Sequence, residues 1–136
     1  MKATVSRHAH FNAAHRLHVR GWSDKKNQEF FGLCNNNNFH GHNYELIVSV
    51  KGEIDPMTGY VFDMKELSNI IKIKVEKRLD HKNLNLDVPA FKNLNPSAEN
   101  IAMVIYKWLK PCFSSDIDLK IRLYETPRNY VDFSDD

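Results

Sequence analysis

Three of the seven histidines in this 136-residue chain have a spacing suited to metal binding. His40 and His42 are two positions apart at the start of a predicted strand, so both side chains point to the same side of it. His15 lies at the end of an earlier predicted strand and would supply a third imidazole if the two strands pair. Three neutral imidazoles that leave one coordination position open are typical of catalytic zinc sites in hydrolases and lyases. On spacing alone, a metal-free His-x-His in a loop is an equal alternative.

A second His-x-His pair, His8 and His10, has the same spacing. A period of two cannot by itself distinguish the two pairs. We expect His8 and His10 to face solvent or to pack on their strand. His18 is assigned no role.

Cys34 lies six positions before His40, in a segment rich in glycine and asparagine. As a fourth zinc ligand it would close a structural site of one cysteine and three histidines. It could instead act as a base or nucleophile, with the pKa of its thiol lowered by a nearby cation. A free cysteine is more often a small buried apolar residue, which is our interpretation of Cys112.

Three carboxylates have chemical roles as alternatives to structural ones. Asp80 directly precedes His81, and a carboxylate beside an imidazole can orient the ring and stabilise its protonated form. Glu125 ends a predicted strand, where its carboxylate could accept two N–H groups from a ligand. Glu99 lies in the first turn of a predicted helix, where a carboxylate ordinarily interacts with the helix dipole. For each of them, a solvated polar residue is the simpler alternative.

The elements that must position these residues begin with two strands, predicted by alternation and β-forming residues over residues 4–14 and 43–51. The segment between them is long for a loop, with a short helix predicted over residues 24–31. Its asparagines at 35–38 indicate a loop rich in side-chain-to-backbone hydrogen bonds. A turn signal precedes residues 60–62, which are predicted to return as a strand.

Two amphipathic helices and two more strands follow. One helix is predicted over residues 64–79 with Asp63 as its N-cap, and a second begins at Ser97. Alternation predicts a half-buried strand over residues 117–123, and residues 129–133 can add a short closing strand. Without the short pieces the order is β-β-α-α-β-β. This order predicts an α+β domain whose four-stranded antiparallel sheet carries both helices on one face.

Composition excludes several classes of protein. A chain of 15.9 kDa with 42% hydrophobic and 26% charged residues fits one globular domain, residues 1–136. A net charge of +2 is too small to indicate a nucleic-acid partner. Apolar runs fall far short of the roughly 20 residues that cross a bilayer, and the N-terminal residues lack a signal peptide's apolar core. We therefore expect a soluble, cytoplasmic protein with no membrane partner.

The predicted sheet has two open edges, which present unpaired backbone groups. A domain of this size can cover such edges by pairing strands between subunits. We therefore expect a homo-oligomer.

Six short motifs occur in a fixed order along nearly the whole chain. They are Phe11-Asn12-Ala13-Ala14-His15-Arg16-Leu17, Phe31-Gly32-Leu33-Cys34-Asn35-Asn36, His40-Gly41-His42-Asn43-Tyr44, Gly52-Glu53-Ile54-Asp55-Pro56, Leu79-Asp80-His81-Lys82-Asn83-Leu84 and Tyr124-Glu125-Thr126. Each is weak alone, but their order and spacing together are specific. Together they resemble the 6-pyruvoyltetrahydropterin synthase and 6-carboxytetrahydropterin synthase family.

The resemblance implies that His15, His40 and His42 hold zinc (Zn²⁺), a choice that spacing alone left open. It also implies the tunnelling fold (T-fold), in which three subunits combine their sheets into a barrel. Two such trimers stack into a homohexamer with active sites at subunit interfaces. This agrees with the expectation drawn from the open sheet edges.

The resemblance further implies that Cys34 is the general base and works with Asp80 and His81. A thiolate base of this kind would remove a proton from a C–H group of the substrate. Glu125 is implied to bind the pterin ring, because a carboxylate can accept from the ring N–H and the exocyclic amine together.

The family's substrate is 7,8-dihydroneopterin triphosphate, which implies a zinc-dependent lyase that forms 6-pyruvoyltetrahydropterin for tetrahydrobiopterin biosynthesis and eliminates triphosphate. Animal members carry two threonines before a pterin-proximal glutamate, where this chain has Ser97-Ala98-Glu99 and so lacks one hydroxyl contact. The sister activity, 6-carboxytetrahydropterin synthase of queuosine biosynthesis, uses the same substrate and zinc but releases acetaldehyde. Five residues separate Cys34 from His40, as in the pyruvoyl branch, but this spacing does not decide the product. A structural zinc module is the non-enzyme alternative.

Overall fold

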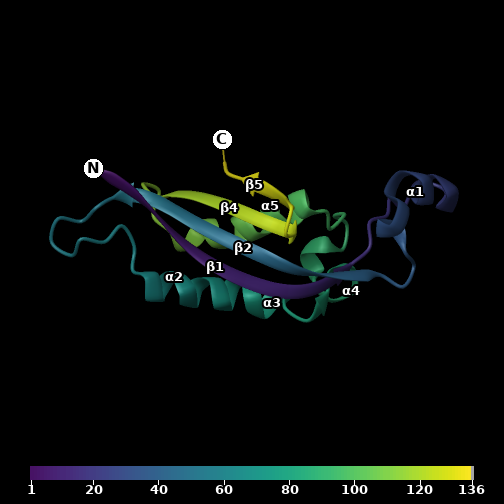
Figure 1. The fold of residues 1–136 in the computed structure, drawn as a ribbon, viewed down its shortest axis with the longest axis horizontal. Helices are drawn as coiled ribbons and strands as arrows, with labels where there is room; N and C mark the ends of the chain where they lie inside the picture. Colours follow the sequence, from purple (N-terminus) through teal and green to yellow (C-terminus); the bar gives the residue numbers. More distant parts are fainter. Residues whose placement is uncertain (136) are drawn as a thin grey trace.

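A long antiparallel ribbon of two strands forms the centre of the fold. The computed structural model describes residues 1–135. β1 (Lys2–His15) and β2 (His40–Glu53) pair along their whole length, from Lys2 opposite Glu53 to His15 opposite His40. Figure 1 shows the two strands crossing the molecule together, with the N-terminus at one end.

Three further strands complete a five-stranded sheet in the order β3-β1-β2-β4-β5. β4 (Asp118–Thr126) pairs antiparallel with β2, and β5 (Asn129–Phe133) pairs antiparallel with β4. β3 (Lys82–Asn83) is a two-residue strand parallel to the end of β1. The predicted α+β fold is therefore confirmed, with one correction. Besides the four expected antiparallel strands, the sheet contains a short fifth strand, β3, which pairs parallel with the outer edge of β1.

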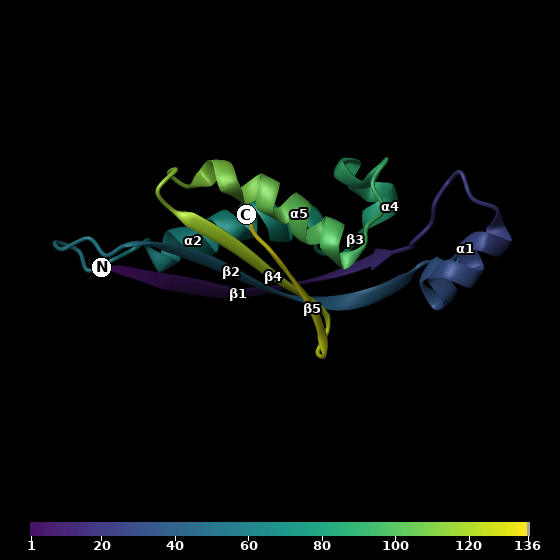
Figure 2. The same cartoon turned by 90° about the horizontal axis from the view of Figure 1, so that it is seen from above.

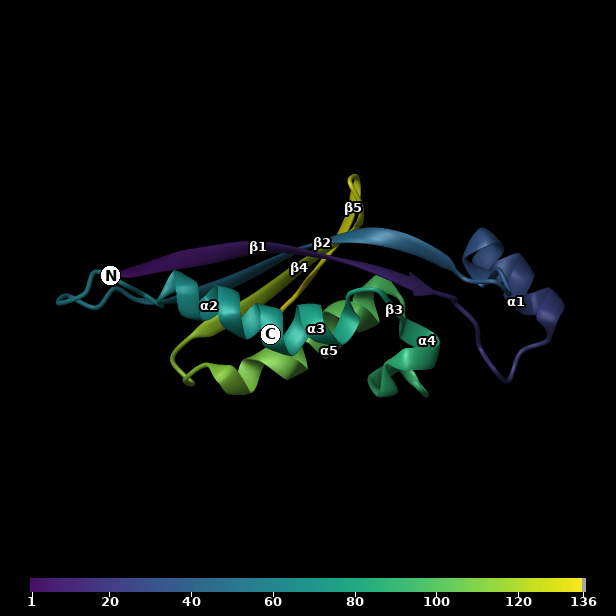
Figure 3. The ribbon, with the colours of Figure 1, turned by 90° about the horizontal axis from the view of Figure 1, so that it is seen from below.

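The longer helices lie on one face of the sheet. α2 (Met64–Ile71), a π-helical turn η2 (Lys72–Glu76) and α3 (Lys77–Leu79) follow one another and match the helix predicted over residues 64–79. α5 (Ala98–Leu109) is the second predicted helix. Figures 2 and 3 show α2, α3 and α5 on the same side of the strands, as expected.

Shorter helical segments occupy the connections. They are α1 (Asp24–Phe31), η1 (Gly32–Asn35), α4 (Leu84–Asp87), η3 (Pro89–Phe91) and η4 (Lys110–Cys112). α1 coincides with the predicted short helix and projects beyond the sheet, where β1 ends and β2 begins (Figure 1). Within residues 1–135, no helix has the length and apolarity to cross a membrane.

The helix-covered face of the sheet is apolar because side chains alternate between the two faces of each strand. The buried strand residues are Phe11, Ala13, Tyr44, Leu46, Val48, Val50, Leu119, Ile121 and Leu123. The helix residues in the same core are Leu67, Ile71, Val75, Leu79, Ile101, Ile105 and Leu109. The opposite face of the sheet carries exposed polar residues such as Ser6, His10 and Glu45.

Side-chain caps set where the two main helices begin. A side-chain oxygen of Asp63 accepts the Lys65 amide at 2.9 Å, and the Ser97 hydroxyl accepts the Asn100 amide at 3.2 Å. Both predicted N-caps are confirmed.

The strand predicted over residues 60–62 is wrong. The preceding turn closes on itself, because the Asp55 amide donates to the Tyr60 carbonyl and the Gly59 amide donates to the Asp55 carbonyl. Phe62 then packs against Phe113, with ring centroids 5.1 Å apart, instead of joining the sheet. Local β propensity gives way here to packing of the aromatic ring.

Candidate metal centre and active site

The register of β1 and β2 brings three histidines together at one end of the buried face. Phe11 lies opposite Tyr44, and their rings stack with centroids 4.9 Å apart. Further along the same face come His42 and then His15, which lies opposite His40. The apolar face thus ends in imidazoles, and the prediction that paired strands would bring three histidines together is confirmed.

The histidine cluster (His15, His40 and His42) has dimensions that fit a metal ion. One ring nitrogen from each residue lies within 4.8 Å of the others. Nε2 of His15 is 3.1 Å from Nε2 of His40. Two imidazoles bound to one tetrahedral zinc ion at about 2.1 Å would hold their nitrogens about 3.4 Å apart. Among residues 1–135, neither a cysteine nor a carboxylate joins this group of atoms.

A backbone carbonyl fixes the orientation of His15. Its Nδ1 lies 2.7 Å from the carbonyl oxygen of Pro96, to which it must donate. Nε2 then presents its lone pair toward His40. Metal-binding histidines usually donate their second ring nitrogen in this way.

Burial favours the neutral form of two imidazoles of the cluster, those of His15 and His40. His15 is fully buried, and this lowers its pKa to about 4. The pKa of His40 is also lowered, first by burial and then by the neighbouring His42. Nε2 of His42 and Nδ1 of His40 are buried without a hydrogen-bond partner among the described residues. Neutral His15 and His40 rings and a buried ring nitrogen of His42 without a hydrogen-bond partner fit a divalent cation, because such a cation would bind that nitrogen.

Asparagine side chains hold the loop between the two long strands. Nδ2 of Asn35 donates to the Leu17 carbonyl, and the Leu17 amide donates to the Cys34 carbonyl, both at 2.8 Å. Nε of Arg16 donates to the Asn35 carbonyl at 3.0 Å. The expected side-chain-to-backbone bonding is confirmed, and it fixes Cys34 beside the end of β1.

The thiol of Cys34 is partly buried and lies outside the histidine cluster. Burial raises its pKa, and the negative charge of Glu125 raises it further. The expectation that a nearby cation such as zinc lowers this pKa stays a prediction. In this chain the charge that acts on the thiol is a carboxylate.

Glu125 reaches the histidine cluster from β4. Its Oε1 lies 3.7 Å from Nε2 of His42. β4 continues to Thr126, beyond its predicted end, so Glu125 lies in extended chain and not in a turn. Both residues line a cavity of about 640 Å³. A partly exposed carboxylate at a cavity wall can accept N–H groups from a ligand.

The start of α5 lies next to the cluster through Pro96. Ser97 follows Pro96 directly, and its hydroxyl oxygen caps α5. The carboxylate of Glu99 is exposed in the first turn and makes no hydrogen bond or ion pair with the described residues. Ser97 is thus the residue next to Pro96, whose carbonyl binds His15. The side chain of Glu99 is exposed to solvent.

Asp80 and His81 form a hydrogen-bonded pair at the outer edge of β1. Nδ1 of His81 lies 3.0 Å from Oδ2 of Asp80, and Oδ1 of Asp80 accepts the Asn12 amide at 2.9 Å. The Asn12 amide is the main cause, and His81 a further cause, of a lowered Asp80 pKa. Within residues 1–135, neither side chain of the pair makes a hydrogen bond or ion pair with Cys34 or the histidine cluster.

The other histidines lie outside the cluster, although His8 lines the same cavity as His42 and Glu125. His8 and His10 are exposed on the face of the sheet that the helices leave uncovered, as expected. Nδ1 of His18 lies 3.2 Å from Nδ2 of Asn35, outside the cluster.

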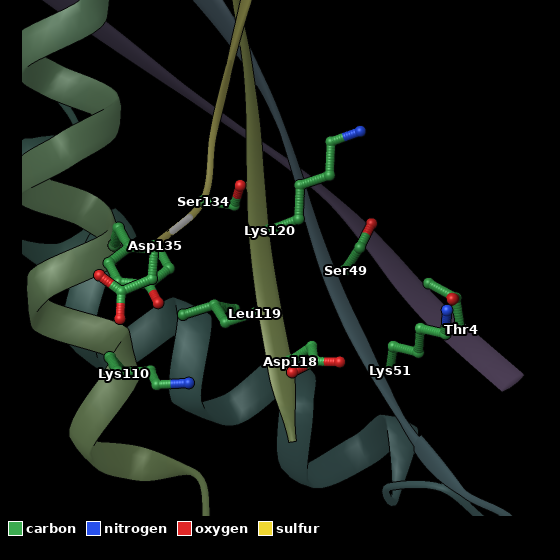
Figure 4. A pocket seen from close by; sticks show the side chains of 10 residues that line it. Thr4, Ser49, Lys51, Lys110, Asp118, Leu119, Lys120, Ser134 and Asp135 are labelled. Carbon is green, nitrogen blue, oxygen red and sulfur yellow. The ribbon is translucent and has the colours of Figure 1, made fainter. Parts of the chain in front are cut away.

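A second hollow, of about 620 Å³, lies at the opposite end of the long strands (Figure 4). Lys51 and Lys120 from the strands and Lys110 at the end of α5 line it, together with Asp118. Lys110 donates to the Ile117 carbonyl at 3.2 Å. Among the described residues of its wall there is no histidine or cysteine, so this hollow lacks the imidazole and thiolate groups that zinc prefers.

Sequence reasoning missed two residues that orient the site. Pro96 acts through a backbone carbonyl, 81 positions from His15, and backbone contacts of this kind leave no signal in residue type. Asn35 joins Leu17 to the Cys34 loop; the asparagine run indicated such bonding but not its partners.

Comparison with known proteins agrees with this geometry. The family model described as 6-pyruvoyl tetrahydropterin synthase matches residues 4–136. The human protein named 6-pyruvoyl tetrahydrobiopterin synthase is 42% identical over 130 residues, covering 96% of this chain and 90% of its own. A Pyrococcus furiosus protein named dihydroneopterin monophosphate aldolase is 34% identical, covering 88% of this chain and 86% of its own.

A solved structure gives the same result for the fold. The structure of Caenorhabditis elegans 6-pyruvoyl tetrahydropterin synthase superposes with a TM-score of 0.93 at 38% identity. The match covers 100% of this chain and 97% of that one.

Proposed function

This chain belongs to the 6-pyruvoyl tetrahydropterin synthase family, and from this we propose that it is a zinc-dependent carbon–oxygen lyase. Its substrate would be 7,8-dihydroneopterin triphosphate, and its products 6-pyruvoyltetrahydropterin and triphosphate. The observation that carries the proposal is the convergence of three imidazoles beside the partly exposed carboxylate of Glu125.

In this proposal His15, His40 and His42 hold zinc. The Pro96 carbonyl orients His15, and burial keeps His15 and His40 unprotonated, so each offers a nitrogen lone pair at neutral pH. A zinc ion held there would act as a Lewis acid on the hydroxyl groups of the substrate side chain.

Cys34 is the proposed general base. Its loop is tied to the end of β1, next to the histidine cluster, by the bond from the Leu17 amide to the Cys34 carbonyl. As a thiolate it would take a proton from the carbon that bears a substrate hydroxyl, and triphosphate would leave with its bonding electrons. A positioned base of this kind contributes about 10²- to 10⁴-fold to the rate.

Glu125 is the proposed anchor of the pterin ring. Its two carboxylate oxygens can accept the ring N–H and the exocyclic amine side by side. The hydroxyl of Ser97 and the carboxylate of Glu99 would add contacts from the start of α5. Ser97 is adjacent to Pro96, whose carbonyl binds His15, which supports a position near the substrate.

The proposed active form is a homohexamer, a dimer of trimers. Two observations support assembly. The outer edge of β1 is unpaired over residues 2–11 in the described chain. Asp80 and His81, proposed to assist Cys34, make no hydrogen bond or ion pair with it within residues 1–135 of one chain. A neighbouring subunit could supply this pair. Light scattering should give a mass several times 15.9 kDa; the single-chain mass would contradict the assembly.

Product analysis tests the proposed function directly. Purified zinc-loaded protein is incubated with 7,8-dihydroneopterin triphosphate, and the pterins are separated and identified by mass. We expect 6-pyruvoyltetrahydropterin and triphosphate. Formation of 6-carboxytetrahydropterin and acetaldehyde would assign the sister activity instead. The aldolase name of the Pyrococcus furiosus relative makes carbon–carbon cleavage products a necessary part of the search.

The structural zinc module is the alternative from a non-enzyme class. It requires Cys34 as a fourth ligand, whereas the atoms that converge in the described chain belong to the histidines alone. Replacement of Cys34 by Ala separates the two. An open catalytic site keeps its zinc and loses turnover, whereas a closed structural site loses metal and stability together.

A further inference from the structure

A basic cavity of about 530 Å³ lies between residues 16–21 and residues 91–96. Its cationic and ionisable lining residues are Arg16, His18, Arg20 and Lys92, and three asparagines add amide groups. None of its lining residues carries a carboxylate. This basic cavity therefore collects positive charge and hydrogen-bond donors without internal neutralisation.

The two arginines of the basic cavity have only neutral partners among the described residues. Arg16 donates through Nε to the Asn35 carbonyl, and Nη2 of Arg20 donates to the Lys92 carbonyl at 3.3 Å. No ion pair among residues 1–135 involves Arg16, Arg20 or Lys92. By contrast, Lys120 on the sheet is paired with a carboxylate at 3.4 Å. The positive charge of the basic cavity is thus available to an anion.

His18 adds a directed donor to the same wall. Nδ2 of Asn35 lies 3.2 Å from Nδ1 of His18. An amide NH₂ group can donate hydrogen bonds but cannot accept them, so Nδ2 is the donor and Nδ1 the acceptor. The ring proton of neutral His18 is then on Nε2. The His18 amide is itself fixed by Oδ1 of Asn95 at 3.1 Å. The ring is therefore held as a donor on a segment fixed at its backbone.

The basic cavity adjoins the histidine cluster at three points. Arg16 follows the cluster residue His15, and Phe39 precedes His40. Pro96 lines the basic cavity and also accepts the Nδ1–H of His15 at 2.7 Å. A ligand that reached the cluster and carried an anionic tail could extend directly into this space.

We propose that the basic cavity binds an oligophosphate. Resting on the function proposed above, this assigns it the triphosphate tail of the substrate, while the side-chain hydroxyls lie at the histidine cluster. Two arginines with neutral partners and a lysine outside any described ion pair suit several phosphate groups, since charge-assisted bonds to phosphate are among the strong hydrogen bonds of proteins. A triphosphate spans several cations at once, and a single phosphate does not.

The test is calorimetric titration of the zinc-loaded protein with inorganic triphosphate and, separately, with inorganic phosphate. We expect triphosphate to bind more tightly and its affinity to fall as salt is raised. Arg20→Gln and Lys92→Gln should each weaken triphosphate binding by about three- to tenfold. Lys77→Gln, which removes an exposed charge from α3 away from the basic cavity, is the matched control and should change nothing. Zinc content measured after each titration detects loss of metal to the chelating anion.

Equal affinities for triphosphate in Lys92→Gln and Lys77→Gln would overturn the proposal, as would triphosphate binding no tighter than phosphate. Titration with unphosphorylated 7,8-dihydroneopterin separates binding of the triphosphate tail from binding of the pterin ring. This compound lacks the tail, so its affinity should be the same for Lys92→Gln and the unsubstituted protein. If the protein formed no product from the full substrate and the calorimetric differences remained, the oligophosphate site would stand and the proposed lyase function would fail.

Discussion

The chain contains two His-x-His pairs on neighbouring strands, and only one of them belongs to a metal-binding arrangement. His8 and His10 lie on β1 opposite Ile47 and Glu45, on the uncovered face of the sheet. His40 and His42 lie on β2, on the face that continues the apolar core. Spacing is the same in both pairs, so the difference comes from the face of the sheet.

The buried pair gains three features that the exposed pair lacks. A third imidazole, His15, lies directly opposite His40. The Pro96 carbonyl fixes the proton of His15 on Nδ1. Burial lowers the pKa of His15 and His40, which favours neutral rings that each have one nitrogen lone pair to offer a metal. A metal site therefore depends on the neighbours of a His-x-His pair and not on the pair alone.

The largest expected effect is on metal content. His40→Ala removes one of three ligands, so zinc should fall from about one per chain to a small fraction, and turnover should be lost with it. His10→Ala is the matched control on the exposed pair and should keep full zinc content. Metal analysis of the two purified variants measures both. Full zinc occupancy in His40→Ala would remove the distinction between the pairs.

Replacing the proposed base should separate chemistry from metal binding. Cys34→Ala should lower turnover by about 10²- to 10⁴-fold, because it removes the group that accepts the substrate proton. Zinc content should stay near that of the unsubstituted protein, since the thiol lies outside the cluster. Near-normal turnover would assign the base role to another group, with Glu99 and His81 as the first candidates.

Much of this arrangement could be predicted from the sequence, because it depends on alternation. The period of two predicted that His40 and His42 lie on one side of a strand. The spacing of apolar residues predicted the two helices that cover the sheet, and Ser97 predicted where the second one begins. Features that depend on long-range contacts could not be predicted. The Pro96 carbonyl reaches His15 only after α5 has docked, and β3 forms only where residues after α3 pass the edge of β1.

The stability of the protein without bound zinc should depend on pH through the buried His15. The pKa of His15 is about 4 in the folded chain and 6.5 in its unperturbed state, so the unfolded chain takes up a proton first as pH falls. Stability is therefore full above pH 6.5 and decreases toward pH 4, with a loss of about 2 kcal/mol between pH 7 and 5. Urea unfolding at the two pH values measures this.

Two controls make that pH experiment specific. His10→Gln should show the same pH dependence as the unsubstituted protein, because His10 is exposed. Added zinc should remove the dependence down to the pH at which the metal dissociates, because binding to the folded state alone stabilises it. A metal-free protein equally stable at pH 7 and 5 would contradict the burial of a neutral His15.

The smallest effect is expected at the outer edge of β1. Asp80→Asn keeps the shape of the side chain but removes the charge that supports a protonated His81. Turnover should fall by about tenfold or more with zinc and pterin binding unchanged. Kinetics with parallel metal analysis measure this, and loss of zinc in Asp80→Asn would show that the pair acts on the fold instead.

X-ray absorption at the zinc edge tests the central claim most directly, because it reports the atoms bound to the metal. The account predicts three imidazole nitrogens at about 2.0–2.1 Å and one further light atom from solvent, with no sulfur. The spectrum of His10→Ala should be identical to that of the unsubstituted protein. A sulfur ligand at about 2.3 Å would identify a closed site that includes Cys34, and would contradict an open metal centre built on the buried histidine pair.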